Sequence, residues 1–180
     1  MIKKGDLQKH SSFGFTLIEL LIVIVVIGIL SGVLISVIDP VRIYNRGRYA
    51  KATADMNKFI SAVEIARVNT GLTLRQITGK NCTACLNSCN VATDLRNNTG
   101  ACYNNWIAAR DAVQNAAGGQ VDLSSITRDP WGSPYLLDEN EGEYDFDPCR
   151  RDSIFTAGID GAPGGSDEQV MTIPFYNCSN

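Results

Sequence analysis

The sequence predicts an α+β protein in which a long N-terminal α-helix, apolar in its first half, packs on a small antiparallel β-sheet. The first observation is an uncharged stretch, since no Lys, Arg, Asp or Glu occurs from Leu20 to Ile38. An apolar run of this length indicates a helix that can span a membrane. The second is an amphipathic helical pattern that continues to Thr70, and the third is a series of short strand-like segments after residue 134.

Composition argues against catalysis and against nucleic-acid binding. The 180 residues suit one domain with an attached segment, and the formal net charge is −3. A mildly acidic chain has no electrostatic reason to bind nucleic acid tightly. The only histidine is His10, so the rest of the chain cannot form a Ser-His-Asp triad or a His-ligated zinc site. We expect no enzyme, and we interpret these acidic residues as exposed turn residues: Asp129, Asp138, Asp147 and Asp152.

The N-terminus is unlike an ordinary secretory signal. A polar segment with several cations ends at Gly14, and Phe15-Thr16-Leu17-Ile18-Glu19 leads into the apolar run. That run is longer than the core of a secretory signal, and no Ala-x-Ala cleavage site follows it. A carboxylate such as Glu19 is costly inside a bilayer, so it needs a partner.

The residues Gly14 to Glu19 resemble the type III signal of type IV prepilins and of type II secretion pseudopilins. The resemblance implies that a prepilin peptidase cuts between Gly14 and Phe15 and that the new amine of Phe15 is methylated. It also implies an assembly role for Glu19, whose carboxylate would pair with the Phe15 amine of a neighbouring subunit and fix register. The alternative is a plain membrane anchor with a stray glutamate.

The resemblance implies a pilin fold with a leader peptide (1–14), a hydrophobic transmembrane and assembly helix (15–38) and an extracytoplasmic head (39–180). The head would include the second half of the long helix, which we expect to run from about Phe15 to Thr70. Pro40 is expected to mark a place where the helix melts locally. The glycines at 28 and 32 lower the stability of the helix, and they also allow close helix packing; the two interpretations do not exclude each other.

All six cysteines follow the apolar run, which suggests structural disulfides in an exported head. Cys149 and Cys178 flank a glycine-rich segment, and we expect them to pair with each other. The other four form a cluster that a zinc site or a redox pair would also explain: Cys82, Cys85, Cys89 and Cys102.

The head is expected to contain one more helix and a sheet. A helical pattern extends from Trp106 to Ala117 after a loop-rich stretch (71–101), and Trp106 is expected in the core. Asp129-Pro130-Trp131-Gly132-Ser133-Pro134-Tyr135 resembles a motif of the major pseudopilin of type II secretion systems, and we interpret it as a fixed turn. Strands are expected at 135–137, 154–156 and 170–173, with a hairpin turn at 139–142.

The glycine-rich segment from Thr156 to Glu168 is similar to the calcium loop of major pseudopilins. Calcium prefers hard oxygen ligands, and glycines let backbone carbonyls converge on an ion. The resemblance implies calcium as a cofactor with these ligands: Asp160, Ser166, Asp167 and Glu168. The alternative is an acidic surface loop that binds no ion.

Together these features predict a structural filament subunit of a type II secretion or type IV pilus system. It would reside in the inner membrane as a single-pass protein with its head outside the cytoplasm, and then enter a periplasmic or cell-surface filament. Its implied partners are other copies of itself, the prepilin peptidase, the inner-membrane assembly platform and minor pseudopilins. The alternative is a surface pilin whose head binds DNA or a surface ligand, although the head arginines are scattered in sequence: Arg110, Arg128, Arg150 and Arg151.

Overall fold

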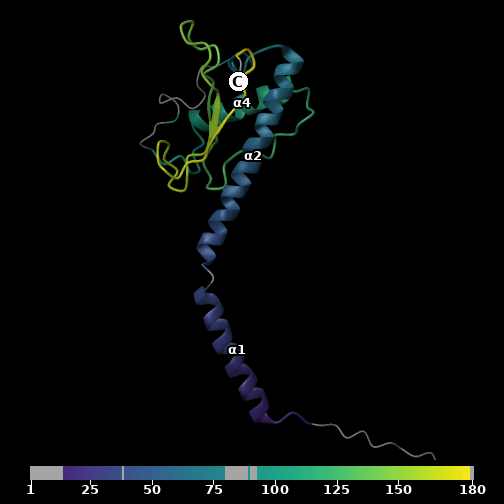
Figure 1. Cartoon of the computed structure of the whole chain (residues 1–180), viewed down its shortest axis with the longest axis vertical. Helices are drawn as coiled ribbons and strands as arrows, with labels where there is room; N and C mark the ends of the chain where they lie inside the picture. Colours follow the sequence, from purple (N-terminus) through teal and green to yellow (C-terminus); the bar gives the residue numbers. More distant parts are fainter. Residues whose placement is uncertain (1–13, 38, 80–88, 90–92, 179–180) are drawn as a thin grey trace, which may run out of the picture. The chain divides into compact units, whose positions relative to one another are not determined.

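The computed structural model describes residues 14–37, 39–79, 89 and 93–178 (Figure 1). The helices in these segments are α1 (Leu17–Val37), α2 (Pro40–Thr70), α3 (Leu74–Thr78) and α4 (Ala101–Ala116). The strands are β1 (Leu136–Asp138), β2 (Ser153–Phe155) and β3 (Val170–Thr172). The predicted α+β class is confirmed. The chain divides into two compact units, 1–43 and 44–180, whereas the predicted boundaries at 14 and 38 stay predictions.

Helix α1 dominates the first unit and has almost no polar surface. Its segment Leu17–Ile35 has a mean hydropathy of 3.0, and none of it is buried within the chain. At about 1.5 Å per residue, its 19 residues reach roughly 28 Å, close to the thickness of a bilayer core. The helix is therefore long and apolar enough to cross a membrane, and its side chains must find their neighbours outside this chain.

The prediction of one continuous helix is wrong, because α1 ends at Val37 and α2 begins at Pro40. The Asp39 carboxylate accepts hydrogen bonds from the backbone N–H groups of Val41 and Arg42, both at 3.1 Å. Asp39 is thus an N-cap. Proline suits the first helical position, where its missing N–H needs no partner. Asp39 and Pro40 together therefore start a new helix. Ile38, which precedes them, lies outside the described residues.

The core of the second unit lies where α2 and α4 meet the sheet. The Trp106 side chain of α4 is fully buried, and its ring lies 5.2 Å from that of Phe59 and 5.4 Å from that of Tyr135. The expected core position of Trp106 is confirmed. Other buried side chains from the helices and strands complete the core: Met56, Val63, Ala109, Val113, Leu137, Ile154 and Ile173.

The sheet has the order β1-β2-β3, and both pairings are antiparallel. Ile154 lies opposite Leu137 on one side and Met171 on the other. The first helical turn of α4 precedes the predicted start at Trp106. The short helix α3 was not predicted, although Thr73 and Gln76 form the capping box that its sequence spacing allows.

A buried ionic cluster joins α2 to the sheet and to the C-terminal segment. The Arg67 guanidinium lies 2.7 Å from the Asp152 carboxylate and 3.3 Å from that of Glu141, and all of these side chains are buried. Asp152 also accepts the N–H groups of Asn140 and Glu141 at 2.6 and 2.8 Å. The exposed-turn interpretation is therefore wrong for Asp152, which is 1% exposed.

The other carboxylate of the cluster binds the backbone of the last described residues. Glu141 accepts the N–H of Tyr176 at 3.0 Å and that of Asn177 at 2.7 Å. Arg67 donates in addition to the carbonyl oxygen of Pro174. The cluster thus holds the C-terminal segment against the end of α2.

Replacing Arg67 with methionine should destabilise the second unit by about 3–5 kcal/mol, because the change leaves two carboxylates buried without their cation. The measurement is urea unfolding of a fragment spanning residues 44–180. The matched control is Lys58→Met, which removes an exposed cation of the same helix and should change stability by less than about 0.5 kcal/mol. Equal midpoints for the two variants would contradict the structural role of the cluster.

Candidate functional site

The start of α1 brings Thr16 and Glu19 together. The Glu19 carboxylate accepts the Thr16 backbone N–H at 2.8 Å and its hydroxyl at 2.7 Å. The backbone N–H of Glu19 donates in turn to the Thr16 hydroxyl oxygen at 3.3 Å. This reciprocal pattern is a capping box, so Glu19 has a local role in starting the helix. A carboxylate has about four acceptor sites, and an ammonium group can bind beside these hydrogen bonds.

The predicted cleavage site precedes this capping box directly. Gly14 and Phe15 are non-helical, and the Phe15 side chain is 80% exposed. The bond between them is thus outside the helix. An amine on Phe15 would lie next to the residue whose N–H group already binds Glu19.

The Asp-Pro-Trp-Gly segment folds as a turn fixed by the Asp129 side chain. One carboxylate oxygen accepts the backbone N–H groups of Trp131 and Ser133, both at 2.9 Å. The Asp129 N–H donates to the Ser133 carbonyl at 2.7 Å. Gly132 has a φ of +102°, a conformation that glycine adopts without strain. The turn leads straight into β1.

Burial changes the protonation of this aspartate. Asp129 is 4% exposed, so the exposed-turn interpretation is wrong for this residue as well. Burial raises the pKa of its carboxyl from 3.8 to about 6, against the effect of the backbone hydrogen bonds. Among the described residues, no group donates a hydrogen bond of normal geometry to its second oxygen, and that oxygen can hold the proton without breaking the turn.

The acidic side chains of the glycine-rich loop bind its own backbone. Asp167 accepts the N–H groups of Ile159 and Asp160 at 2.5 and 3.2 Å. Asp160 accepts the N–H of Ala162 at 2.9 Å, and Glu168 accepts that of Gly164. The fourth predicted ligand, Ser166, is exposed. The loop therefore has a defined shape that these carboxylates stabilise.

Oxygen atoms from three residues lie near Gly165. A side-chain carbon placed there would lie 2.8 Å from an Asp167 carboxylate oxygen and 3.8 Å from both an Asp160 oxygen and the Ala162 carbonyl. Carboxylate and carbonyl oxygens are the ligands of calcium. Within the described ranges, no group of three or more His, Cys, Asp or Glu side chains could hold a metal. A calcium ion in this loop would therefore need backbone carbonyls as ligands in addition to the carboxylates.

A segment just before α4 packs on this loop, a contact for which the sequence offers no local signal. The Leu95 N–H donates to the Gly161 carbonyl at 2.8 Å, and Arg96 donates to the Ile159 carbonyl at 3.3 Å. Arg96 is paired with Asp94 at 2.6 Å. That pairing and the nearby Asp160 carboxylate raise the pKa of Arg96. A guanidinium thus already lies beside one candidate calcium ligand.

Disulfides anchor both segments. The structure joins Cys89 to Cys102 and Cys149 to Cys178. Cys102 is therefore unable to act as the fourth thiolate of a zinc site. The remaining members of the cluster, Cys82 and Cys85, lie outside the described residues.

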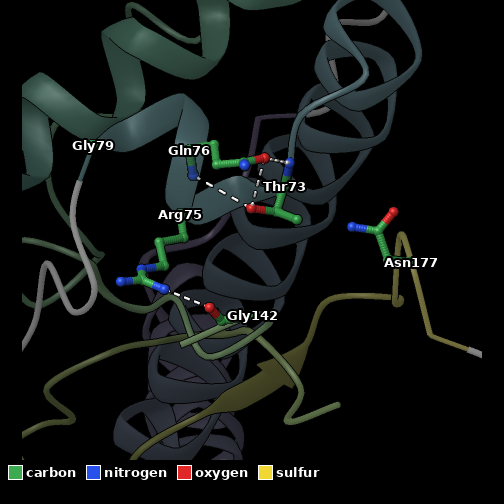
Figure 2. A pocket seen from close by; sticks show the side chains of 6 residues that line it. All are labelled: Thr73, Arg75, Gln76, Gly79, Gly142 and Asn177. Atoms are coloured by element: carbon green, nitrogen blue, oxygen red, sulfur yellow. Dashed lines mark hydrogen bonds between the residues drawn. The ribbon is translucent and has the colours of Figure 1, made fainter. Parts of the chain in front are cut away.

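A polar pocket of about 530 Å³ lies at the end of α3 (Figure 2). Its polar groups are engaged with one another, since Thr73 bonds to Gln76 and Arg75 donates to the Gly142 carbonyl. Gly79 and Asn177 complete the lining. Among the described residues that line the pocket there is no pair of carboxylates and no nucleophile beside a base.

The Asp129 pKa predicts a pH dependence of stability. Because the folded state binds this proton more tightly than the unfolded chain does, Asp129 costs stability as pH rises from about 4 to about 6. Asp129→Asn should therefore raise the stability of residues 44–180 by about 1–3 kcal/mol at pH 7 and change it little at pH 4. Thermal unfolding across this range tests the prediction.

The control is Asp145→Asn, which alters an exposed residue and should leave the pH profile unchanged. Asp152, whose pKa burial also raises, stays in both variants. A profile for Asp129→Asn that is parallel to the wild-type profile would show that Asp129 does not titrate in this range.

Comparison with known proteins adds two findings. Residues 9–35 match a family model described as the prokaryotic N-terminal methylation motif. The chain is also 27% identical over 162 residues to the type II secretion system core protein G of Aeromonas hydrophila, a match that covers 90% of this chain and 93% of that protein. No solved structure matches.

Proposed function

From its confirmed resemblance to the type IV pilin-like family, we propose that this chain is a filament subunit of a type II secretion system. The precursor is cut by a prepilin peptidase between Gly14 and Phe15, and Phe15 is methylated. The subunit waits in the inner membrane as a single-pass protein with its head outside the cytoplasm. It then assembles with its own copies and minor pseudopilins on an inner-membrane platform.

The exposed apolar surface of α1 is the observation that supports this proposal most. Large side chains around the whole helix are between about half and four-fifths exposed, for example Val23 at 46% and Leu17 at 83%. Complete transfer of such a side chain out of water is favourable by roughly 1.5–3 kcal/mol of free energy. Lipid covers this surface before assembly, and neighbouring copies of α1 cover it in the filament. A structural role of this kind needs no catalytic residues.

The alternative of a DNA-binding head finds little support in the charges of the second unit. Arg110 pairs with Asp111 at 2.6 Å and Arg150 with Glu143 at 3.2 Å. Arg128 donates to the carbonyl oxygens of Gly132 and Asn98. These arginines serve the fold, and a phosphate backbone would have to compete with their present partners.

Glu19→Gln separates the local role of this residue from its proposed role in assembly. The amide oxygen can still accept the Thr16 hydrogen bonds, but it cannot form an ion pair with the Phe15 amine of a neighbour. We expect the variant to be inserted in the membrane and cut after Gly14, and to form about tenfold fewer filaments. Mass spectrometry of the N-terminus and electron microscopy of sheared filaments are the measurements. Wild-type filament numbers would mean that capping alone explains Glu19.

Calcium is the proposed ligand of the glycine-rich loop, with Asp160, Asp167 and the Ala162 carbonyl around one point and with Ser166 and Glu168 completing the set. EGTA should lower the melting temperature of residues 44–180 by several degrees, because it removes a ligand that binds only the folded state. Asp160→Asn keeps the acceptor for the Ala162 N–H and removes the charge, so EGTA should have little effect on it. Asp145→Asn serves as the control. If EGTA does not shift the wild type, the loop binds no calcium.

A further inference from the structure

The most exposed aromatic side chain among the described residues of the second unit is Phe146, which is 85% exposed. It belongs to a turn of residues 143–147, called here the acidic aromatic turn. The Phe146 ring lies 5.2 Å from that of Tyr144. An aromatic pair held in water is a typical anchor of a protein interface, where such rings gain most from burial.

Several contacts hold the acidic aromatic turn in place although its aromatic residues are exposed. Tyr144 and Asp147 face each other across a β-bridge, and the Gly142 N–H donates to the Pro148 carbonyl at 2.9 Å. The Arg150 guanidinium packs on the Tyr144 ring at 5.4 Å. The disulfide at Cys149 follows directly. A surface that is already ordered loses little conformational entropy when it binds.

The charges of the turn select a basic partner. Glu143, Asp145 and Asp147 alternate with the two aromatic residues, and the turn itself contains no cation. Of these three carboxylates, that of Glu143 already pairs with the Arg150 guanidinium. A complementary surface therefore needs cations for Asp145 and Asp147 and an apolar or aromatic face for Phe146.

Such a surface lies at the first residues of the second unit, on α2. Residues 44–48, called here the basic helix end, contain Tyr44, Arg46 and Arg48 and no acidic residue. Tyr44 is 60% exposed, and the Arg48 guanidinium lies 4.4 Å above its ring. Arg46 is exposed. Arginine and tyrosine side chains are enriched where protein interfaces are strongest.

Within one chain, these two surfaces are at opposite ends of α2. Arg67, near the last turn of α2, bonds to Glu141 just before the acidic aromatic turn. Tyr44 lies roughly 35 Å from Arg67 along the helix, at about 1.5 Å per residue. Figure 1 shows the chain around residue 145 at the Thr70 end of α2. The basic helix end of the same chain is out of reach, so a second copy has to supply it.

We propose that the acidic aromatic turn of one copy docks on the basic helix end of the next copy in the filament. A contact between two different surfaces of identical chains repeats without closing unless its rotation makes a ring, which is the geometry of a filament. The contact rests on the proposed filament function. It connects the second units of neighbouring copies, in addition to the cohesion between their apolar helices. Phe146 packs beside Tyr44, and Asp145 and Asp147 face the arginines.

A photo-crosslinking experiment on the full chain in assembling cells tests the contact. Phe146 is replaced by the photoreactive analogue p-benzoyl-phenylalanine, which keeps an aromatic ring at this exposed position. Mass spectrometry of crosslinked dimers should join residue 146 of one copy to residues 44–48 of another. Filaments whose crosslinks map elsewhere would overturn the docking and leave the filament function intact. Absence of filaments from the wild-type chain would overturn the filament function and the docking together.

Charge reversal supplies a second measurement in the same photo-crosslinking strain. Asp145→Arg and Arg46→Glu should each lower the yield of this crosslink about tenfold, and the double variant should restore it to within about twofold. Glu64→Arg is the control, because it reverses an exposed acidic residue of α2 outside both surfaces. The amount of cut, membrane-inserted chain monitors folding in every variant. Single variants that crosslink like the wild type would contradict the pairing, as would a double variant no better than the singles.

Discussion

The buried Arg67 cluster is the constraint on which the rest of the second unit depends. One guanidinium in the last turns of α2 contacts carboxylates from the segment after β1 and from the residue before β2. Removing two carboxylates and an arginine from water is unfavourable unless the partners meet in good geometry. The cluster therefore penalises any arrangement in which the sheet slides along the helix or the C-terminal segment leaves it. Apolar packing around Trp106 supplies cohesion, and the cluster selects one arrangement.

This constraint also positions the exposed features that matter for the proposed function. Glu141 belongs to the cluster and precedes the acidic aromatic turn with only Gly142 between them, while its carboxylate accepts the N–H groups of Asn177 and Cys178. The disulfide from Cys178 returns to Cys149 at the far side of the same turn. An exposed aromatic turn is thus fixed at both ends by buried or covalent interactions. Because α2 is a continuous helix from Pro40 to Thr70, the turn has a fixed distance from the basic helix end.

Local signals in the sequence predicted much of this structure, and non-local ones were missed. The apolar run, the amphipathic pattern and the strand segments depend on neighbouring residues, and so does the Asp-Pro-Trp-Gly turn. Two missed features also had local signals, namely the role of Asp39 as the N-cap of a helix that begins at Pro40 and the capping box of Thr73 and Gln76. The burial of Arg67 had none, because its partners lie 74 and 85 residues away in the sequence.

Asp129 and Asp152 have the polarity of exposed residues, and only their distant neighbours explain why they are buried. The packing of Arg96 on the glycine-rich loop is non-local for the same reason.

The capping box at Thr16 and Glu19 shows how one carboxylate can suit two environments in succession. A charged side chain in a bilayer is tolerated near the surface, where water and polar groups reach it. Glu19 is in the first turn of α1, and its hydrogen bonds to Thr16 satisfy part of its acceptor capacity before any partner arrives. Its negative charge is also favourable at the positive end of the helix dipole. When the proposed filament forms, lipid and water leave and an ammonium from a neighbour becomes the available counter-charge. An isolated subunit therefore has a stable resting state, and the ion pair favours only the register in which the amine reaches Glu19.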